Sequence, residues 1–155
     1  MVNPTSIITN GKVNLKTPTQ EDPIQVLYVD GDADSSKATK LCLELHGSFE
    51  IDVASSVDAA KERMKMKTFE VIVSDCVMPK KGGSESLREL RKQGNGIPLI
   101  LFAIMEEKEV KNEALKVGAN ACIGKFGDPE TVYRDLAHNI TRLVKEQRAI
   151  KKTKT

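Results

Sequence analysis

The fold of this chain is decided by the run Val71-Ile72-Val73-Ser74-Asp75. Three consecutive β-branched apolar residues are typical of a strand that is buried on both faces of a parallel sheet. The turn signal Gly82-Gly83 follows, and Leu87 and Leu90 then recur at helical spacing. This segment therefore predicts a strand and then a helix, with an acidic residue at the carboxyl end of the strand.

The same pattern of a strand followed by a helix occurs five times along residues 24–144. The predicted strands cover residues 24–29, 49–53, 69–74, 97–103 and 121–123. Five such units in succession predict a parallel sheet with right-handed crossovers and helices on both faces. Of the two common strand orders, the flavodoxin-like order 2-1-3-4-5 suits five strands. The expected fold class is therefore α/β, a doubly wound (βα)5 sheet.

The boundaries and buried faces of the helices also follow from the sequence. Asp34, Ser35 or Ser36 is expected to cap the first helix. An apolar stripe with i, i+3, i+4 and i+7 spacing predicts its core face. That stripe consists of Ala38, Leu41, Cys42 and Leu45. Asp128-Pro129, a cap followed by proline at the first helical position, predicts the start of the last helix. Its buried face is expected to contain Val132, Leu136, Ile140 and Leu143.

The length of 155 residues allows one domain with a segment at each end. We expect an N-terminal leader over residues 1–23, the domain over 24–144 and a basic C-terminal tail over 145–155. Within the leader, Asn10-Gly11 is a strong hairpin signal. The leader could form a hairpin or a flexible tail, and the sequence does not decide between these two alternatives. The basic tail is too short for an output domain, and its cations suit the end of a helix.

The composition excludes several classes of protein. Apolar residues make up 39% and charged residues 30%, as in a globular protein. No apolar run could span a membrane and no signal core follows Met1, so a cytoplasmic protein is expected. A net charge of +2 with 4% aromatic residues does not favour a nucleic-acid partner. Cys42, Cys76 and Cys122 lack CxxC spacing, so neither a disulfide framework nor a zinc site is predicted, and Cys42 and Cys122 are expected in the core.

Acidic residues and a lysine stand at the carboxyl ends of the predicted strands. Asp30 ends the first strand, Asp75 ends the third, and Lys125 follows the fifth. Ligands of such sheets bind beyond these strand ends. Carboxylates gathered there repel one another unless a cation joins them, and Mg²⁺ prefers carboxylate oxygens. A carboxylate beside Mg²⁺ and a lysine can accept a phosphoryl group, so the pattern indicates phosphoryl chemistry at this edge.

Over residues 24–144 the sequence resembles the receiver domains of response regulators in two-component signalling. The resemblance is carried by Val26-Leu27-Tyr28-Val29-Asp30, by Val71-Ile72-Val73-Ser74-Asp75 with Met78-Pro79 and Gly82-Gly83, by Ile97-Pro98-Leu99-Ile100, and by Gly118-Ala119 leading to Lys125. It implies that Asp75 is the phosphoacceptor and that Lys125 contacts the phosphoryl group. It also implies that Asp30, Asp75 and the backbone carbonyl of Val77 bind Mg²⁺.

The sequence departs from that family's pattern at four positions. Gly31 stands where a second acid usually contacts Mg²⁺, so weaker metal binding is expected, and Asp32 is a further candidate ligand. Ala103 replaces the hydroxyl residue that ends the fourth strand. Phe126 replaces the proline after the lysine, and Cys122 replaces the aromatic residue of the fifth strand. These departures imply a weakened switch.

The resemblance implies a receiver module of a phosphorelay and not an enzyme. Such a module takes a phosphoryl group on Asp75 from a sensor histidine kinase or a phosphotransfer protein and signals by contact with a downstream protein; a homodimer stays open. One alternative is a degenerate receiver that binds partners without phosphorylation. Another is a haloacid-dehalogenase-type phosphatase with Asp30 as nucleophile, although Asp34 stands where that family has Thr or Val. A flavin-binding flavodoxin is disfavoured, because the acidic first loop would repel a phosphate.

Overall fold

A computed structural model describes residues 22–75, 83–93 and 96–153, together with two short strands, β1 (Ile8–Thr9) and β2 (Lys12–Val13). These two strands pair in an antiparallel manner, and the turn expected at Asn10-Gly11 lies outside the described residues. Among the described residues, no helix is both long enough and apolar enough to cross a membrane.

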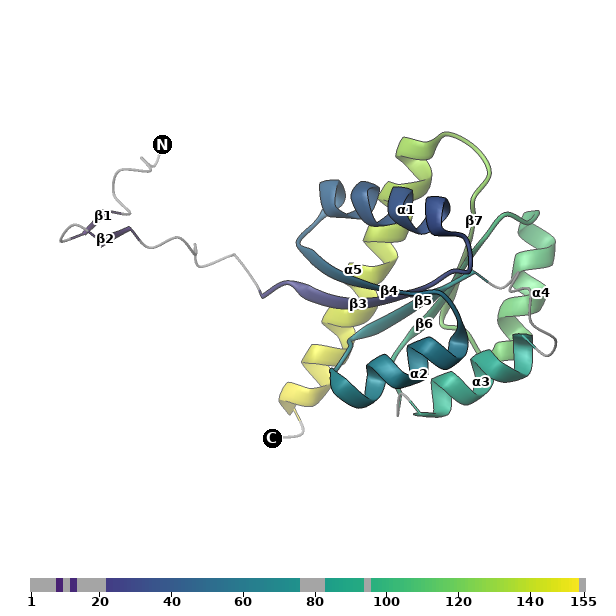
Figure 1. The fold of residues 1–155 in the computed structure, drawn as a ribbon. Helices are drawn as coiled ribbons and strands as arrows, with labels where there is room; N and C mark the ends of the chain where they lie inside the picture. Colours follow the sequence, from purple (N-terminus) through teal and green to yellow (C-terminus); the bar gives the residue numbers. More distant parts are fainter. Residues whose placement is uncertain (1–7, 10–11, 14–21, 76–82, 94–95, 154–155) are drawn as a thin grey trace.

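Five parallel strands form the main sheet (Figure 1). They are β3 (Ile24–Val29), β4 (Phe49–Ala54), β5 (Val71–Ser74), β6 (Leu99–Ala103) and β7 (Ala121–Gly124). Their order across the sheet is β4-β3-β5-β6-β7. When only these five strands are counted, this is the predicted order 2-1-3-4-5, so the prediction of a flavodoxin-like doubly wound sheet is confirmed. Every residue of the central strand β5 is buried, as its run of β-branched residues predicts.

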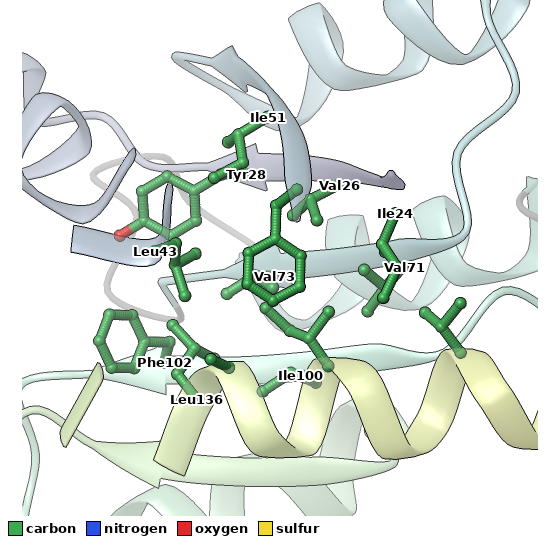
Figure 2. Close-up of a cluster of buried hydrophobic side chains, with 14 of the residues drawn as sticks. Ile24, Val26, Tyr28, Leu43, Ile51, Val71, Val73, Ile100, Phe102 and Leu136 are labelled. Carbon is green, nitrogen blue, oxygen red and sulfur yellow. The ribbon is translucent and has the colours of Figure 1, made fainter. Parts of the chain in front are cut away.

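Five helices cover the two faces of the sheet. They are α1 (Ala33–His46), α2 (Val57–Met66), α3 (Gly83–Gln93), α4 (Glu107–Val117) and α5 (Pro129–Thr153). Helices α1 and α5 pack on one face, and α2, α3 and α4 pack on the other (Figure 1). Figure 2 shows the core under α1 and α5, where Leu43 and Leu136 meet side chains from β3, β5 and β6. Alternate residues of each strand enter the two cores because successive side chains point to opposite faces.

The prediction of the buried face of α1 is wrong, because much of the predicted apolar stripe is exposed to solvent. Leu41 and Leu45 are 64% and 84% exposed, and Cys42 is only half-buried. The residues that α1 buries are Ser36, Thr39 and Leu43. Two of these three are polar, so a pattern of apolar residues alone points to the opposite side of the helix.

The start of α1 also differs from the prediction. Asp32 is the N-cap, and its Oδ1 accepts hydrogen bonds from the backbone N–H groups of Asp34 and Ser35 at 2.9 and 3.1 Å. An acidic side chain at this position satisfies backbone donors that have no partner within the helix. The loop between β3 and α1 is consequently only three residues long, Asp30 to Asp32.

Helix α5 begins as predicted and includes most of the basic segment after residue 144. Asp128 caps it, since its Oδ2 accepts the Thr131 N–H at 3.1 Å. The four residues of the predicted buried face are all buried: Val132, Leu136, Ile140 and Leu143. The helix continues to Thr153, so the boundary predicted at residue 144 falls within it. Arg148 forms a bidentate pair with Glu70, with N–O distances of 2.7 and 2.8 Å, and these bonds lower the pKa of the Glu70 carboxyl.

Candidate functional site

The carboxyl edge of the sheet brings Asp30, Asp75 and Lys125 together. Each residue stands one position beyond its strand, where its backbone N–H still donates to the neighbouring strand, at 3.0, 3.0 and 2.8 Å respectively. The Nζ of Lys125 lies 3.8 Å from Asp30 Oδ2 and 3.9 Å from Asp75 Oδ2. One ammonium group therefore faces both carboxyl groups, as the sequence predicted for these strand ends.

The three charged side chains of this site are largely buried, so their electrostatic interactions are stronger than they would be in water. The side chains of Asp30, Asp75 and Lys125 are 2%, 16% and 10% exposed. Charges removed from water are tolerated when they are paired and hydrogen-bonded. A cation bound between Asp30 and Asp75 would lower the repulsion between their carboxylates.

Sequence reasoning missed Tyr28, whose hydroxyl joins Asp30 and Lys125. It donates to Asp30 Oδ2 at 2.9 Å and accepts from Lys125 Nζ at 3.3 Å. Burial raises the pKa of Tyr28 above its usual range, so the phenol keeps its proton. A signal was present in the sequence, because Tyr28 stands in a strand two residues before Asp30, and residues i and i+2 share a face.

The buried ring of Phe102 contacts the ammonium group of Lys125. The Lys125 Nζ lies 4.8 Å from the centroid of the Phe102 ring, within the range of a cation–π contact. The same ring meets Tyr133 edge-on, with centroids 5.7 Å apart. Phe102 itself is fully buried, so it fixes the lysine from the side of the core.

Gly124, which precedes Lys125, allows the close approach of two strand ends. A Cβ added at Gly124 would lie 2.9 Å from the carbonyl oxygen of Met105, closer than side chains are found. The backbone after β7 can therefore approach the loop after β6, which places Lys125 over the pocket.

Asp30 and Asp75 are the two carboxylates that could hold Mg²⁺. Asp32 is engaged as the cap of α1, and its own N–H donates to Asp30 Oδ1 at 2.9 Å. Val77 lies outside the described residues. Among the residues that are described, no group of three His, Cys, Asp or Glu side chains is arranged to hold a metal ion. Since Mg²⁺ is often held by one or two carboxylates together with substrate phosphate oxygens, the pair fits a weakly held ion.

The three other positions that depart from the family's pattern stand on β6, on β7 and directly after Lys125. Ala103 is fully buried and has no hydroxyl group. Cys122 is half-buried on β7, where it packs against the core at its margin, and burial raises the pKa of its thiol. Phe126 is 56% exposed. None of these three side chains can donate a strong hydrogen bond to a group on Asp75.

The family model described as the response regulator receiver domain matches residues 26–137. The CpxR homolog of Haemophilus influenzae, a transcriptional regulatory protein, is 30% identical over 111 residues, which are 71% of this chain and 48% of that protein. The response regulator Rre1 of Synechocystis is 24% identical over 120 residues, which are 74% of this chain and 52% of that protein. The chain thus spans about half the length of these relatives.

Solved structures of response regulators are also similar to this chain. The chemotaxis response regulator CheY4 of Vibrio cholerae superposes with a TM-score of 0.64 at 26% identity, over 76% of this chain and 98% of that one. A receiver domain of a Francisella response regulator superposes with a TM-score of 0.66 at 28% identity, over 80% of this chain and 98% of that one.

Proposed function

The chain belongs to the response regulator receiver domain family, and on that premise we propose that Asp75 is the residue that takes up the phosphoryl group. Receiver domains of two-component response regulators are signalling modules that are phosphorylated on an aspartate. The observation that supports Asp75 is its place 3.9 Å from Lys125 with a side chain that is 16% exposed, whereas Asp30 is 2% exposed. A nucleophile must be reached by its donor, so the more accessible carboxylate is the better acceptor.

The reaction that this geometry suits is a direct phosphoryl transfer. A carboxylate oxygen of Asp75 attacks phosphorus, the bond to the donor breaks, and an acyl phosphate forms on Asp75. The ammonium of Lys125 balances negative charge on the phosphoryl oxygens. Receiver domains typically bind Mg²⁺ at this site, where it supplies further neutralisation of the phosphoryl charge. In this chain Asp30 and Asp75 would hold it, with Val77 and Asp32 as further candidate ligands.

Receiver domains interact with sensor kinases and downstream effectors. For this chain the proposed donor is the phosphohistidine of a sensor histidine kinase or a phosphotransfer protein, and the proposed output is contact with a downstream protein in the cytoplasm. A homodimer is one form that this contact could take.

Incubation with a small phosphodonor such as phosphoramidate, with and without Mg²⁺, tests the proposal. Mass mapping should find one phosphoryl group, on Asp75, and none in Asp75→Asn. A group on Asp30 would favour the phosphatase of the haloacid-dehalogenase type. No uptake by the intact chain would favour the second candidate, a receiver that binds partners without phosphorylation. The buried Ala103, which offers no hydroxyl, is the observation in favour of that second candidate.

We expect Gly31→Asp to tighten Mg²⁺ binding by about tenfold, since an interaction with a charged group contributes roughly 1.5–3 kcal/mol. Gly31 is exposed and is not among the glycines with positive φ, so aspartate fits its backbone. Titration calorimetry measures the affinity, and Gly31→Asn, similar in size but uncharged, is the control. Equal affinities of the unmodified chain, Gly31→Asp and Gly31→Asn for Mg²⁺ would contradict the prediction. A carboxylate at position 31 would then add nothing, either because Asp32 already binds the ion or because no metal binds.

Phosphorylation should produce only a small change along β6, α4 and β7. A bound group shifts a two-state equilibrium only by its difference in affinity for the two states. Ala103 cannot supply the hydrogen bond that would favour the active arrangement, a bond worth about tenfold in population. Amide chemical shifts with and without beryllofluoride should therefore change little over residues 106–117 and at Cys122.

Ala103→Thr provides the complementary measurement. The threonine hydroxyl should spread the shifts onto α4, whereas Ala103→Val, which matches it in shape, should not. Widespread shifts on α4 in the unmodified chain would contradict the prediction, and Ala103→Thr would then add little.

A further inference from the structure

A row of three hydroxyl groups leads from the pocket to the contact between α1 and α5. Tyr28 on β3 and Thr39 on α1 are both fully buried, and Tyr133 stands on α5. Thr39 Oγ1 lies 3.3 Å from the Tyr133 hydroxyl and 3.5 Å from the Tyr28 hydroxyl. The Tyr28 hydroxyl in turn lies 2.9 Å from Asp30 Oδ2. The consecutive elements β3 and α1 thus share one chain of hydrogen bonds with α5, which is distant in sequence.

The direction of the bonds in this chain follows from counting protons. A phenol has one proton and two lone pairs. Tyr28 donates its proton to Asp30, and its lone pairs accept from Lys125 and Thr39. Because Thr39 donates its proton to Tyr28, it must accept from Tyr133. The chain therefore runs from Tyr133 through Thr39 and Tyr28 to Asp30, and hydrogen bonds in such a row strengthen one another.

We propose that Tyr28 is a positioning residue that couples the phosphorylation pocket to the contact between α1 and α5. The inference rests on the proposed phosphorylation of Asp75. When Lys125 turns to the phosphoryl oxygens, it releases the Tyr28 hydroxyl, which loses one of its three partners. Thr39 and Tyr133 then rearrange with it. This route needs neither a hydroxyl at position 103 nor an aromatic ring at position 122.

The surroundings of the chain leave room for this rearrangement. A cavity of about 270 Å³ lies beside Lys125, and Ser35, Phe102 and Tyr133 are among the residues that line it. Ser35 Oγ is 3.4 Å from Lys125 Nζ, so α1 contacts the lysine directly as well. Figure 2 shows Tyr28 close to Leu43 of α1, with its hydroxyl oxygen at the edge of the apolar cluster. The helices that would move, α1 and α5, pack against each other.

Amide chemical shifts induced by beryllofluoride with Mg²⁺ test the coupling in three proteins: the intact chain, Tyr28→Phe and Thr39→Val. In the intact chain we expect shifts at the pocket and also at Thr39 and Tyr133. In Tyr28→Phe the shifts at positions 39 and 133 should fall several-fold relative to those at the pocket. Thr39→Val should give the same loss, although the hydrogen bonds of the Thr39 hydroxyl are to Tyr28 and Tyr133 and not to the charged groups of the pocket. Valine keeps the shape of threonine. A role in packing alone would leave the spread of shifts unchanged.

The possible outcomes separate this inference from the function on which it rests. Shifts at positions 39 and 133 that are as large in both variants as in the intact chain would overturn the coupling alone. An intact chain that binds no beryllofluoride would overturn the proposed phosphorylation, and the coupling with it. Thermal unfolding checks that the variants fold; if Tyr28→Phe does not, the comparison with Thr39→Val decides.

Discussion

Phosphoryl uptake at Asp75 is expected to fall by about 10²–10³-fold when Lys125 is replaced by alanine, the usual effect of removing one group that stabilises charge in a transition state. The ammonium nitrogen of Lys125 lies 3.9 Å from Asp75 Oδ2. It is also largely buried, so water cannot fully replace its charge. Initial rates of phosphoryl uptake, followed by intact mass after quenching, measure the loss.

Two further variants show whether the charge or the packing of Lys125 matters. Lys125→Met keeps an apolar stem over Phe102 but has no charge, and it should be as slow as Lys125→Ala. Lys116→Ala removes a lysine that is 61% exposed and paired with Glu113, and it should react at the normal rate. Normal uptake by Lys125→Met would contradict the assigned role of the ammonium group.

Much of the fold could be predicted from the sequence because its signals are local. The apolar runs of the strands and the caps of the helices each occupy a few consecutive residues, and the strand order follows from their number. The convergence of Asp30, Asp75 and Lys125 follows in turn, since parallel strands end at one edge of the sheet. This part of the site needed no knowledge of side-chain contacts.

The buried face of α1 could not be predicted in the same way. Thr39 is buried because its hydroxyl finds partners on Tyr28 and Tyr133, which are 11 and 94 residues away. Leu41 remains in solvent although hydropathy places it in the core. A polar residue enters a core when its hydrogen bonds are satisfied there, and those partners are set by the tertiary structure.

The contacts of the end of α5 could not be predicted for a related reason. The residues after Val144 are rich in Lys and Arg, which is typical of a solvated helix end. Arg148 instead pairs with Glu70, 78 residues away, and also approaches the carbonyl oxygen of Asp22 at 3.5 Å. A charge pattern read along one helix does not contain these partners.

Phe102→Ala should lower the free energy of unfolding by about 3–5 kcal/mol, as for other buried phenylalanines. The ring is fully buried, with Lys125 over it and Tyr133 at its edge, so its removal leaves a cavity and also two lost ring contacts. Urea unfolding with an unchanged m-value measures the difference.

Phe102→Leu separates the volume of this ring from its electrostatic role. Leucine fills most of the cavity, so most of the stability should return. Leucine has no π-face, so the ammonium of Lys125 loses its cation–π contact in both variants, and phosphoryl uptake should be slower in both. A loss below about 1 kcal/mol in Phe102→Ala would contradict the prediction, because changes of that size are typical of surface positions. Normal uptake by Phe102→Leu would show that Tyr28 and Ser35 position Lys125 without help from the ring.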